Sequence, residues 1–418
     1  MLTDGFESKR ENIRHFYAYF LTVILVLTGV ASAENSSRQY SGGNPCDFID
    51  SVEFNGTAAN ESVLWQTSIG PRLPGSNASA QLRQSISENL TQWSFEESSH
   101  QRENFTLTNL VGTYSPNNST GQNVVFVAHY DSRYIGERDE NETLRSQPIP
   151  GANDGASGVA VLIELGRIIP SLDLQHDVTL FFTDAEDQGK PFLENTWSYG
   201  ADAWVSNLTE EYKENISAYI VVDMIGDAYL DFTRVSSTSN VLWDTVTPIA
   251  AALGMIDGEV DCQGNNGLSI YNPDPGAERG VIDDHVAAHN AGIPAINFID
   301  LNYGENAAFF GGHWHTHNDT ADKVSSESLE YIGSILELGL RTDAWVWNHS
   351  EVQHENATLN SSENEQSVNN EQSVNNEQSV GDEVRNEIQN YPWLTFFGGF
   401  SIAMVLLLVV LLRWQIRD

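Results

Sequence analysis

Between about residues 45 and 347, short apolar runs alternate with segments of helical periodicity, and this alternation limits the fold more than any other feature. The run DVTLFF has the length and the β-branched and aromatic content of a buried strand. The preceding segment GASGVAVLIELGRII opens with small residues and continues with helical spacing. Strands and helices in alternation predict an α/β fold, with a doubly wound, mostly parallel central sheet and helices on both faces.

Acidic and histidine side chains follow the predicted strands. They are His129 after VVFVA, Asp154 in the turn GANDGASG, Glu186 and Asp187 after VTLFF, Asp223 after YIVV, and His315 in GGHWHTHND. Any one of them alone would be explained as a helix cap, a turn residue or a solvated charge. In open α/β sheets, however, sites assemble at the carboxyl ends of the strands. Together these residues predict a zinc site with a carboxylate beside it that moves protons.

The charge balance excludes one large class of functions. The 418 residues include 58 Asp and Glu but only 20 Lys and Arg, for a formal net charge of −38. Nucleic acids are bound mainly through positive charge, so no nucleic-acid partner is expected. The two cysteines, Cys46 and Cys262, lie in no metal-binding or redox spacing. They could form one disulfide outside the cell or remain two unpaired structural thiols.

Both ends of the chain resemble membrane-targeting segments. Residues 1–33 combine basic residues, an apolar run and Ala-Ser-Ala, which predicts a signal peptide, with an uncleaved anchor as the alternative. Residues 391–412 are uncharged and long enough to span a bilayer. The arginines in the tail at 413–418 favour a cytoplasmic C-terminus. We therefore expect a single-pass protein of the cell membrane whose catalytic domain lies outside the cytoplasm.

Residues 351–390 are polar, acidic and built on NEQSVN repeats, which predicts a disordered stalk between the catalytic domain and the membrane. Many Asn-x-Ser/Thr sites, which are the acceptors of N-glycosylation, agree with an extracytoplasmic glycoprotein. Examples are Asn55, Asn60, Asn77, Asn89, Asn104, Asn141, Asn207, Asn215 and Asn356.

A set of motifs resembles a known family. AHYDSR, GANDGASGVAVLIELGR, FFTDAEDQG, VVDMIG, DDHVAAHNAGIPA and HWHTHNDTADKV occur in the order found in M28-type zinc peptidases. The resemblance covers about residues 60–340 and implies a zinc catalytic domain over 45–347. Two activities share this scaffold: glutaminyl-peptide cyclotransferase, with one zinc ion, and aminopeptidase, with two. Either one acts on peptide or protein N-termini.

Several features resemble the cyclotransferases of bacterial and animal type more than the aminopeptidases. The insert QGKPFLENTWSYG follows the acid pair, and Asp283 stands where aminopeptidases commonly carry Ser. Trp314 directly precedes His315, and the loop 133–150 is long. This resemblance implies one zinc held by Asp154, Asp187 and His315.

The resemblance also implies roles for the residues around the metal. Glu186 would carry a proton, and Asp223 and Asp283 would form an acid network that orients the substrate's amide nitrogen. Trp314 and Trp197 would wall the substrate pocket.

Other interpretations stay open. In a di-zinc aminopeptidase, His129 and Asp223 would hold the second ion, Asp154 would bridge the two, and Glu186 would activate a water. A non-catalytic binding module on the same fold would be the third possibility. We assign no metal to His285, His289, His313 or His317, and only a structural role to Asp184.

Overall fold

The structure, a computed structural model, describes residues 42–347 apart from 103 and 191–192. The chain divides into two compact units, Met1–His349 and Ser350–Asp418, and the described residues all belong to the first. The expected signal peptide at 1–33, stalk at 351–390, membrane span at 391–412 and tail at 413–418 lie outside the described residues. None of the helices in the described ranges combines the length and apolarity needed to cross a bilayer.

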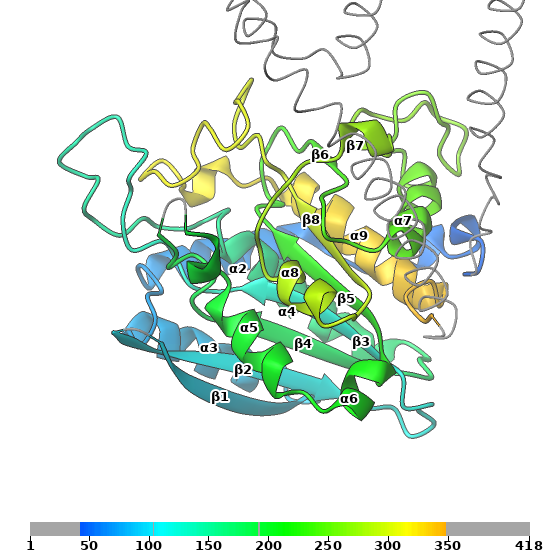
Figure 1. Cartoon of the computed structure of the whole chain (residues 1–418). Coiled ribbons are helices and arrows are strands. Elements are labelled where there is room, and N and C mark those ends of the chain that lie inside the picture. The colour runs from blue at the N-terminus through cyan, green and yellow to red at the C-terminus, as the bar shows by residue number, and fades with distance from the viewer. Residues whose placement is uncertain (1–41, 103, 191–192, 348–418) are drawn as a thin grey trace, which may run out of the picture. The chain divides into compact units, whose positions relative to one another are not determined.

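A six-stranded sheet forms the centre of the domain (Figure 1). Its strands are β1 (Ser94–Arg102), β2 (Phe105–Tyr114), β3 (Asn123–His129), β4 (Asp177–Thr183), β5 (Ile216–Asp223) and β8 (Ala295–Ile299), in the spatial order β1-β2-β4-β3-β5-β8. The pairings β4–β3, β3–β5 and β5–β8 are parallel, whereas β1–β2 and β2–β4 are antiparallel. The sheet is therefore mixed, with a parallel part that carries the predicted strands and an antiparallel edge that the sequence did not indicate.

Burial of the parallel strands explains their continuous apolar sequences. Every residue of β3 and β5 is buried, and so is every residue of β4 except Asp177. A strand covered on both faces has no solvated side and therefore shows no polar alternation. Strand β1 at the edge is partly exposed along its whole length and has the polar sequence SFEESSHQR. That composition gives no apolar signal of a strand.

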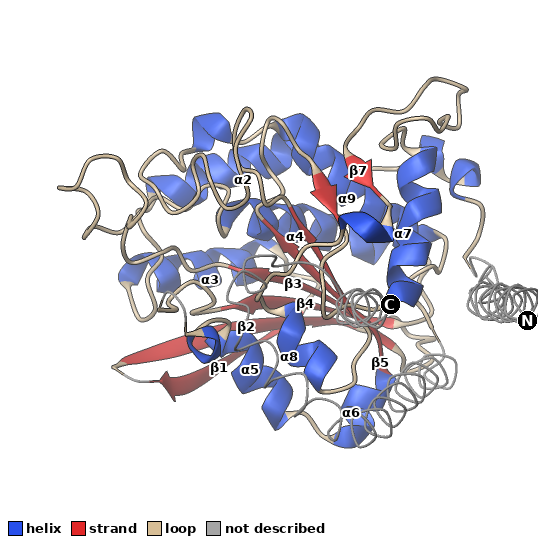
Figure 2. Ribbon diagram, turned by 45° about the horizontal axis from the view of Figure 1, so that its top comes forward, coloured by secondary structure: helices blue, strands red, loops and turns tan. Residues whose placement is uncertain are grey.

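Helices cover both faces of the sheet (Figure 2), which confirms the predicted α/β class. One face packs against α2 (Gly56–Ser68), α3 (Asn77–Asn89), α4 (Ala156–Ile168), α7 (Asn240–Ala252) and α9 (Ser326–Arg341). The other packs against α5 (Tyr199–Asn207), α6 (Glu210–Asn215) and α8 (His285–Asn290). Successive residues of a strand point to opposite faces, so Phe126 lies in the first core and Val127 in the second.

Helix α9 shows how the sequence encodes one of these elements. Ser325 precedes the helix, and its hydroxyl accepts hydrogen bonds from the backbone N–H groups of Glu327 and Ser328, which caps the first turn. Leu329, Ile332 and other apolar residues at helical spacing then face the core. The segment SSESLEYIGSILELGLR thus forms an amphipathic helix over Ser326–Arg341.

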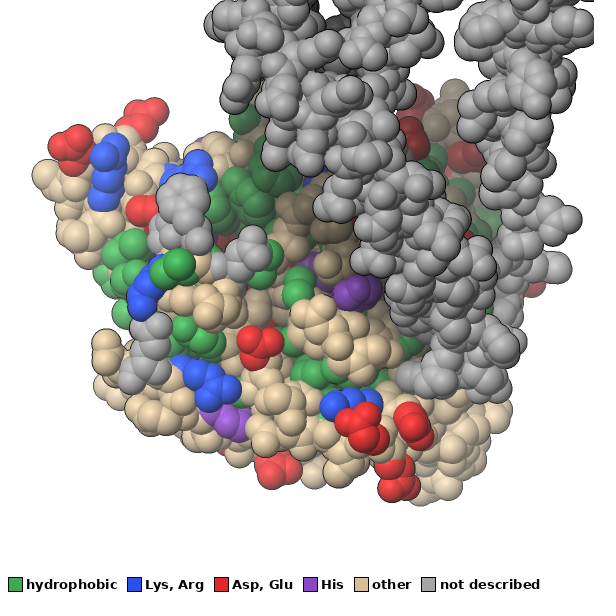
Figure 3. Space-filling model, in the orientation of Figure 1, with side chains coloured by type: hydrophobic (Ala, Val, Ile, Leu, Met, Phe, Trp, Pro, Cys, Tyr) green, Lys and Arg blue, Asp and Glu red, His purple; other side chains and the backbone are tan. Residues whose placement is uncertain are grey.

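Short elements complete the domain. A small two-stranded sheet pairs β6 (Phe232–Thr233) with β7 (Tyr271–Asn272) in parallel. The 3₁₀ helices are η1 (Pro45–Asp47), η2 (Ile49–Ser51), η3 (Ile169–Ser171), η4 (Glu194–Thr196), η5 (Pro275–Ala277) and η6 (Ala321–Lys323). Acidic side chains and a basic one gather over α6 on the face shown in Figure 3. There, Glu210 and Lys213 form an exposed ion pair of 2.8 Å.

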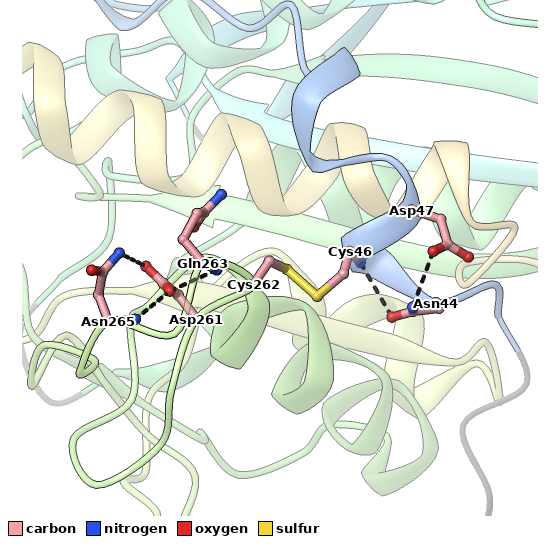
Figure 4. The surroundings of a disulfide bond; sticks show 7 residues. All are labelled: Asn44, Cys46, Asp47, Asp261, Cys262, Gln263 and Asn265. Atoms are coloured by element: carbon pink, nitrogen blue, oxygen red, sulfur yellow. Dashed lines mark hydrogen bonds between the residues drawn. A yellow bond between two sulfur atoms is a disulfide. The ribbon is translucent and has the colours of Figure 1, made fainter.

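Cys46 and Cys262 form a disulfide (Figure 4), which decides between the two states that the sequence allowed. Cys46 lies in η1 and Cys262 follows α7, 216 residues later in the chain. Both cysteines sit beside turns held by local hydrogen bonds, in which Asn44 accepts from the Cys46 N–H and Asp261 accepts from the Gln263 N–H. The bond therefore ties the start of the described domain to the region after α7.

Replacing both cysteines by serine should lower the free energy of unfolding by about 2–4 kcal/mol, because the unfolded chain loses a long covalent loop. Denaturant titration of the wild type and of the variant C46S/C262S, each with and without a reductant, measures this. The reductant should destabilise the wild type and leave the variant unchanged. Equal midpoints for oxidised and reduced wild type would contradict the prediction.

Candidate metal centre and active site

The residues predicted from strand ends come together at the carboxyl edge of the parallel strands. His129 is the last residue of β3 and Asp223 the last of β5. Asp187 follows β4, Asp154 precedes α4, and His315 lies in the loop after β8. All of these side chains are buried. The topology therefore gathers residues from distant parts of the sequence, as the rule for open α/β sheets requires.

Two groups of these residues have the spacing of a metal site. One consists of His129, Asp154 and Asp223, the other of Asp154, Asp187 and His315, and Asp154 belongs to both. In each group the candidate ligand atoms lie within 4.8 Å of one another. His129 Nε2 is 3.0 Å from Asp223 Oδ1 and 3.3 Å from Asp154 Oδ1.

In the second group, His315 Nε2 is 3.1 Å from Asp187 Oδ1 and 3.7 Å from Asp154 Oδ2.

Unpartnered oxygens show that the second group fits a cation. Asp154 Oδ2 and Asp187 Oδ2 are buried and accept no hydrogen bond from any described residue. Burial, followed by the nearby carboxylate of Asp154, raises the pKa of Asp187 to about 6. Two carboxylates forced together out of water are costly unless a positive charge lies between them. Two carboxylates and one imidazole are a donor set that zinc accepts, with room for a further ligand.

Neighbouring carboxylates hold the candidate ligands in place. Asp131 accepts hydrogen bonds from the backbone N–H groups of Glu186 and Asp187, both at 3.1 Å, and lies 3.5 Å from His129 Nδ1. Asp319 accepts from the backbone N–H of Asp154 at 3.2 Å. Asp319 was not predicted as a site residue, although it stands in the same HTHND segment as His315.

The backbone at the site is locally strained. Ala185, Met224 and His315 have φ angles of 62°, 47° and 56°, in the left-handed region that non-glycine residues rarely adopt. Ala185 precedes Glu186 and Met224 follows Asp223, so each strained residue is a site residue or adjoins one. Strain of this kind persists where the surrounding contacts fix the backbone, and it is common at functional sites.

Three acidic side chains line the site together: Asp223 of the first metal group, and Glu186 and Asp283, which belong to neither group. Burial, together with the charge of Asp283, raises the pKa of Glu186 well above its ordinary value. Burial also raises the pKa of Asp223 to about 7, with Asp283 adding to the effect and His129 opposing it. Asp283 itself accepts a 2.6 Å hydrogen bond from Asn297. These environments allow a carboxyl group to hold a proton near neutral pH and to pass it on.

A cavity of about 780 Å³ opens beside these residues. Its lining includes Glu186, Asp223 and Asp283. Trp197 and Trp314 line it as well, so both predicted pocket residues are present. The volume is in the range of small-ligand pockets.

The remaining predicted residues stay apart from the metal groups. Asp184 accepts a hydrogen bond from the Thr108 N–H at 2.7 Å, which links β4 to β2. His285 is buried with its Nε2 atom 3.0 Å from the Ser236 carbonyl oxygen, and His289 is exposed. None of His285, His289, His313 and His317 belongs to a candidate metal group of the described residues.

Comparison with known proteins identifies the family. A model of peptidase family M28 matches residues 109–338, which is more than half of the chain. The chain belongs to peptidase family M28. The resemblance noted from the sequence motifs is thereby confirmed, and the matched range contains every candidate ligand of both metal groups.

The proteins similar to this chain include an aminopeptidase and a glutaminyl cyclase by name. Aminopeptidase YwaD of Bacillus subtilis (strain 168) is 26% identical over 240 residues, which are 56% of this chain and 44% of that protein. The glutaminyl cyclase of Tannerella forsythia is similar in structure with a TM-score of 0.57 and 25% identity, over 69% of this chain and 98% of that one. A Zn-dependent exopeptidase from Parabacteroides distasonis is similar in structure with a TM-score of 0.58 and 23% identity, over 70% of this chain and 99% of that one.

The chain therefore has the same fold as these structures. Its reaction depends on the residues of the site. The chain spans less than half the length of the aminopeptidase relative.

Replacing His315 by alanine should weaken zinc binding by on the order of 100-fold, because one protein ligand contributes about 3 kcal/mol to a structural zinc site. Competition with a chromophoric chelator measures the zinc affinity. His289→Ala, the same change at an exposed histidine, is the matched control and should bind like the wild type. Equal affinity of H315A and H289A would remove His315 from the metal centre.

Proposed function

We propose that this M28 protein is a glutaminyl-peptide cyclotransferase, which closes an N-terminal glutamine to pyroglutamate and releases ammonia. The observation that carries this proposal is the group of Glu186, Asp223 and Asp283 in one cavity. A glutamine side chain ends in an amide whose NH₂ donates two hydrogen bonds, and acidic oxygens are suitable acceptors for it. Removal of a residue by hydrolysis needs no such acceptors for a side-chain amide.

The proposed reaction joins two groups of one substrate molecule. The α-amine nitrogen attacks the γ-carbonyl carbon, a new C–N bond closes the ring, and the bond to the amide nitrogen breaks. Glu186 takes the proton from the α-amine and gives it to the departing nitrogen, which leaves as ammonia. Zinc held by Asp154, Asp187 and His315 would supply the positive charge that polarises the carbonyl. Asp283 and Asp223 would hold the amide nitrogen for its departure.

The insert after the acid pair builds part of the pocket wall. Trp197 packs directly over Gly189, where a Cβ atom would lie only 2.1 Å from the indole ring. Glycine is therefore required at this position to let the ring approach. This indole lines the cavity beside Glu186.

A di-zinc aminopeptidase is the second candidate, and one observation favours it. His129 and Asp223 form a complete second metal group with Asp154 shared between the two groups. Glu186 would then take a proton from an attacking water, and peptide hydrolysis would follow. A purely non-catalytic module has no such support, since every residue proposed for catalysis is present in the described site.

We also propose that the catalytic domain acts outside the cytoplasm, as a glycoprotein tethered by the helix predicted at 391–412. The disulfide Cys46–Cys262 supports this placement because such bonds persist in oxidising compartments.

The two enzyme functions predict different products from two peptides. Incubation of the zinc-loaded protein with a Gln-initiated peptide should produce a peptide lighter by one ammonia, as measured by mass spectrometry. A Leu-initiated peptide of the same length should remain intact. Release of free leucine together with an unchanged Gln peptide would overturn the proposal in favour of the aminopeptidase.

Glu186→Gln should keep the fold and the bound zinc but lower the turnover by about 10²–10⁴-fold, because the amide cannot carry the proton. Steady-state kinetics and a zinc determination on the same sample measure both properties. Glu140→Gln, an exposed residue in the loop 133–150, is the matched control. Turnover of E186Q equal to that of E140Q would remove Glu186 from the mechanism.

A further inference from the structure

We propose that Glu137 and Arg133 are positioning residues that fix the imidazole of His315 for the metal. Both lie in the long loop 133–150, for which no contact with the metal ligands was predicted from the sequence. The inference rests on the proposed metal group of Asp154, Asp187 and His315, and it holds for either candidate reaction.

The first contact sets which nitrogen of His315 faces the metal group. Glu137 Oε1 lies 2.9 Å from His315 Nδ1. A carboxylate can only accept a hydrogen bond, so Nδ1 carries the proton and donates it. In the neutral imidazole that binds a metal, the lone pair is then on Nε2, the nitrogen that lies 3.1 Å from Asp187 Oδ1 and 3.7 Å from Asp154 Oδ2. Carboxylates commonly orient metal-binding histidines in this way.

Arg133 in turn holds Glu137. The guanidinium of Arg133 has no exposed surface, and its Nε and Nη2 atoms donate to Glu137 at 2.7–3.2 Å. Its Nη1 atom donates to the backbone carbonyls of Asp187 and Gly189, both at 2.8 Å. One buried cation therefore links the residue that orients His315 to the backbone of a second candidate ligand.

Aromatic rings restrict the same imidazole further. The Trp314 ring is stacked on His315 with centroids 3.6 Å apart, and Trp197 lies nearly parallel to His315 at 6.2 Å. The Arg133 guanidinium is 4.7 Å from the Trp197 ring, and Arg138 covers Trp314 at 4.5 Å. The loop 133–150 thus supports His315 through Glu137 and supports the two indoles through Arg133 and Arg138.

These contacts explain how His315 keeps its strained backbone. A φ of 56° is unfavourable for histidine, and such strain persists only where the surroundings over-determine the residue. The Arg138 N–H donates to the His315 carbonyl oxygen at 3.3 Å, so the loop also holds this backbone. The ring is therefore held in its ligand orientation by protein contacts alone, which lowers the cost of metal binding.

The test compares Glu137→Gln with Glu142→Gln in the full-length protein. Gln at 137 keeps the size of the side chain but loses the negative charge that the imidazole and Arg133 face. Glu142 lies in the same loop, is largely exposed and forms a 3.7 Å pair with Arg145, so E142Q is the matched control. Chelator competition gives the zinc affinity, and the absorption spectrum of the cobalt-loaded protein reports the geometry of the ligands.

We expect E137Q to bind zinc about 10–100-fold more weakly than the wild type, with an altered cobalt spectrum, and E142Q to match the wild type. The unfolding midpoint of the metal-free protein should differ little between the two variants. Unchanged zinc affinity in E137Q would overturn the proposal. So would an equal loss in E142Q, or a loss in E137Q that merely follows a large drop in the metal-free midpoint.

A different result is expected if Asp154, Asp187 and His315 do not form a metal site. In that case the wild type itself would bind no zinc, whatever residue stands at 137. The choice between cyclisation and hydrolysis does not enter this test, because no substrate is used.

Discussion

The carboxylates of Asp154, Asp187 and Asp223 converge in a buried space at the edge of the sheet, and this convergence determines much of the surrounding structure. Buried like charges repel one another unless a cation or a proton compensates them. The strained turns, the capping carboxylates behind the ligands and the buried Arg133 all keep these groups together. A domain that only had to be stable would not need such an arrangement, because apolar side chains of similar volume would pack at lower cost.

Proteins named as an aminopeptidase and as a glutaminyl cyclase are both similar to this chain, so the reaction depends on what surrounds the candidate ligands. His129 and Asp223 belong to a second candidate metal group, whereas Asp283 and the two indoles line the cavity. Metal ligands alone therefore carry little information about the substrate. The segments around the ligands, such as the insert after Asp187, carry more information about the substrate.

Much of the site could be predicted from the sequence because its residues follow strands that are buried on both faces. Continuous apolar runs marked β3, β4 and β5, and the polar residue after each run marked the edge. The antiparallel strand β1 was missed because its partly exposed residues are mostly polar. Glu137 was missed for a related reason: a loop has no periodic pattern, and the contact with His315 joins residues 178 positions apart. The pairing of Cys46 with Cys262 likewise depends on tertiary structure alone.

Gly189 beneath Trp197 has a consequence for altering this pocket. Since no side chain fits under the indole, the wall can be redesigned by changing residue 197 but not by building outward from residue 189. A smaller residue at 197 would enlarge the pocket and at the same time uncover the guanidinium of Arg133. A substitution at residue 197 therefore changes both the shape of the pocket and the surroundings of Arg133. A library of variants at this position alters the two properties together.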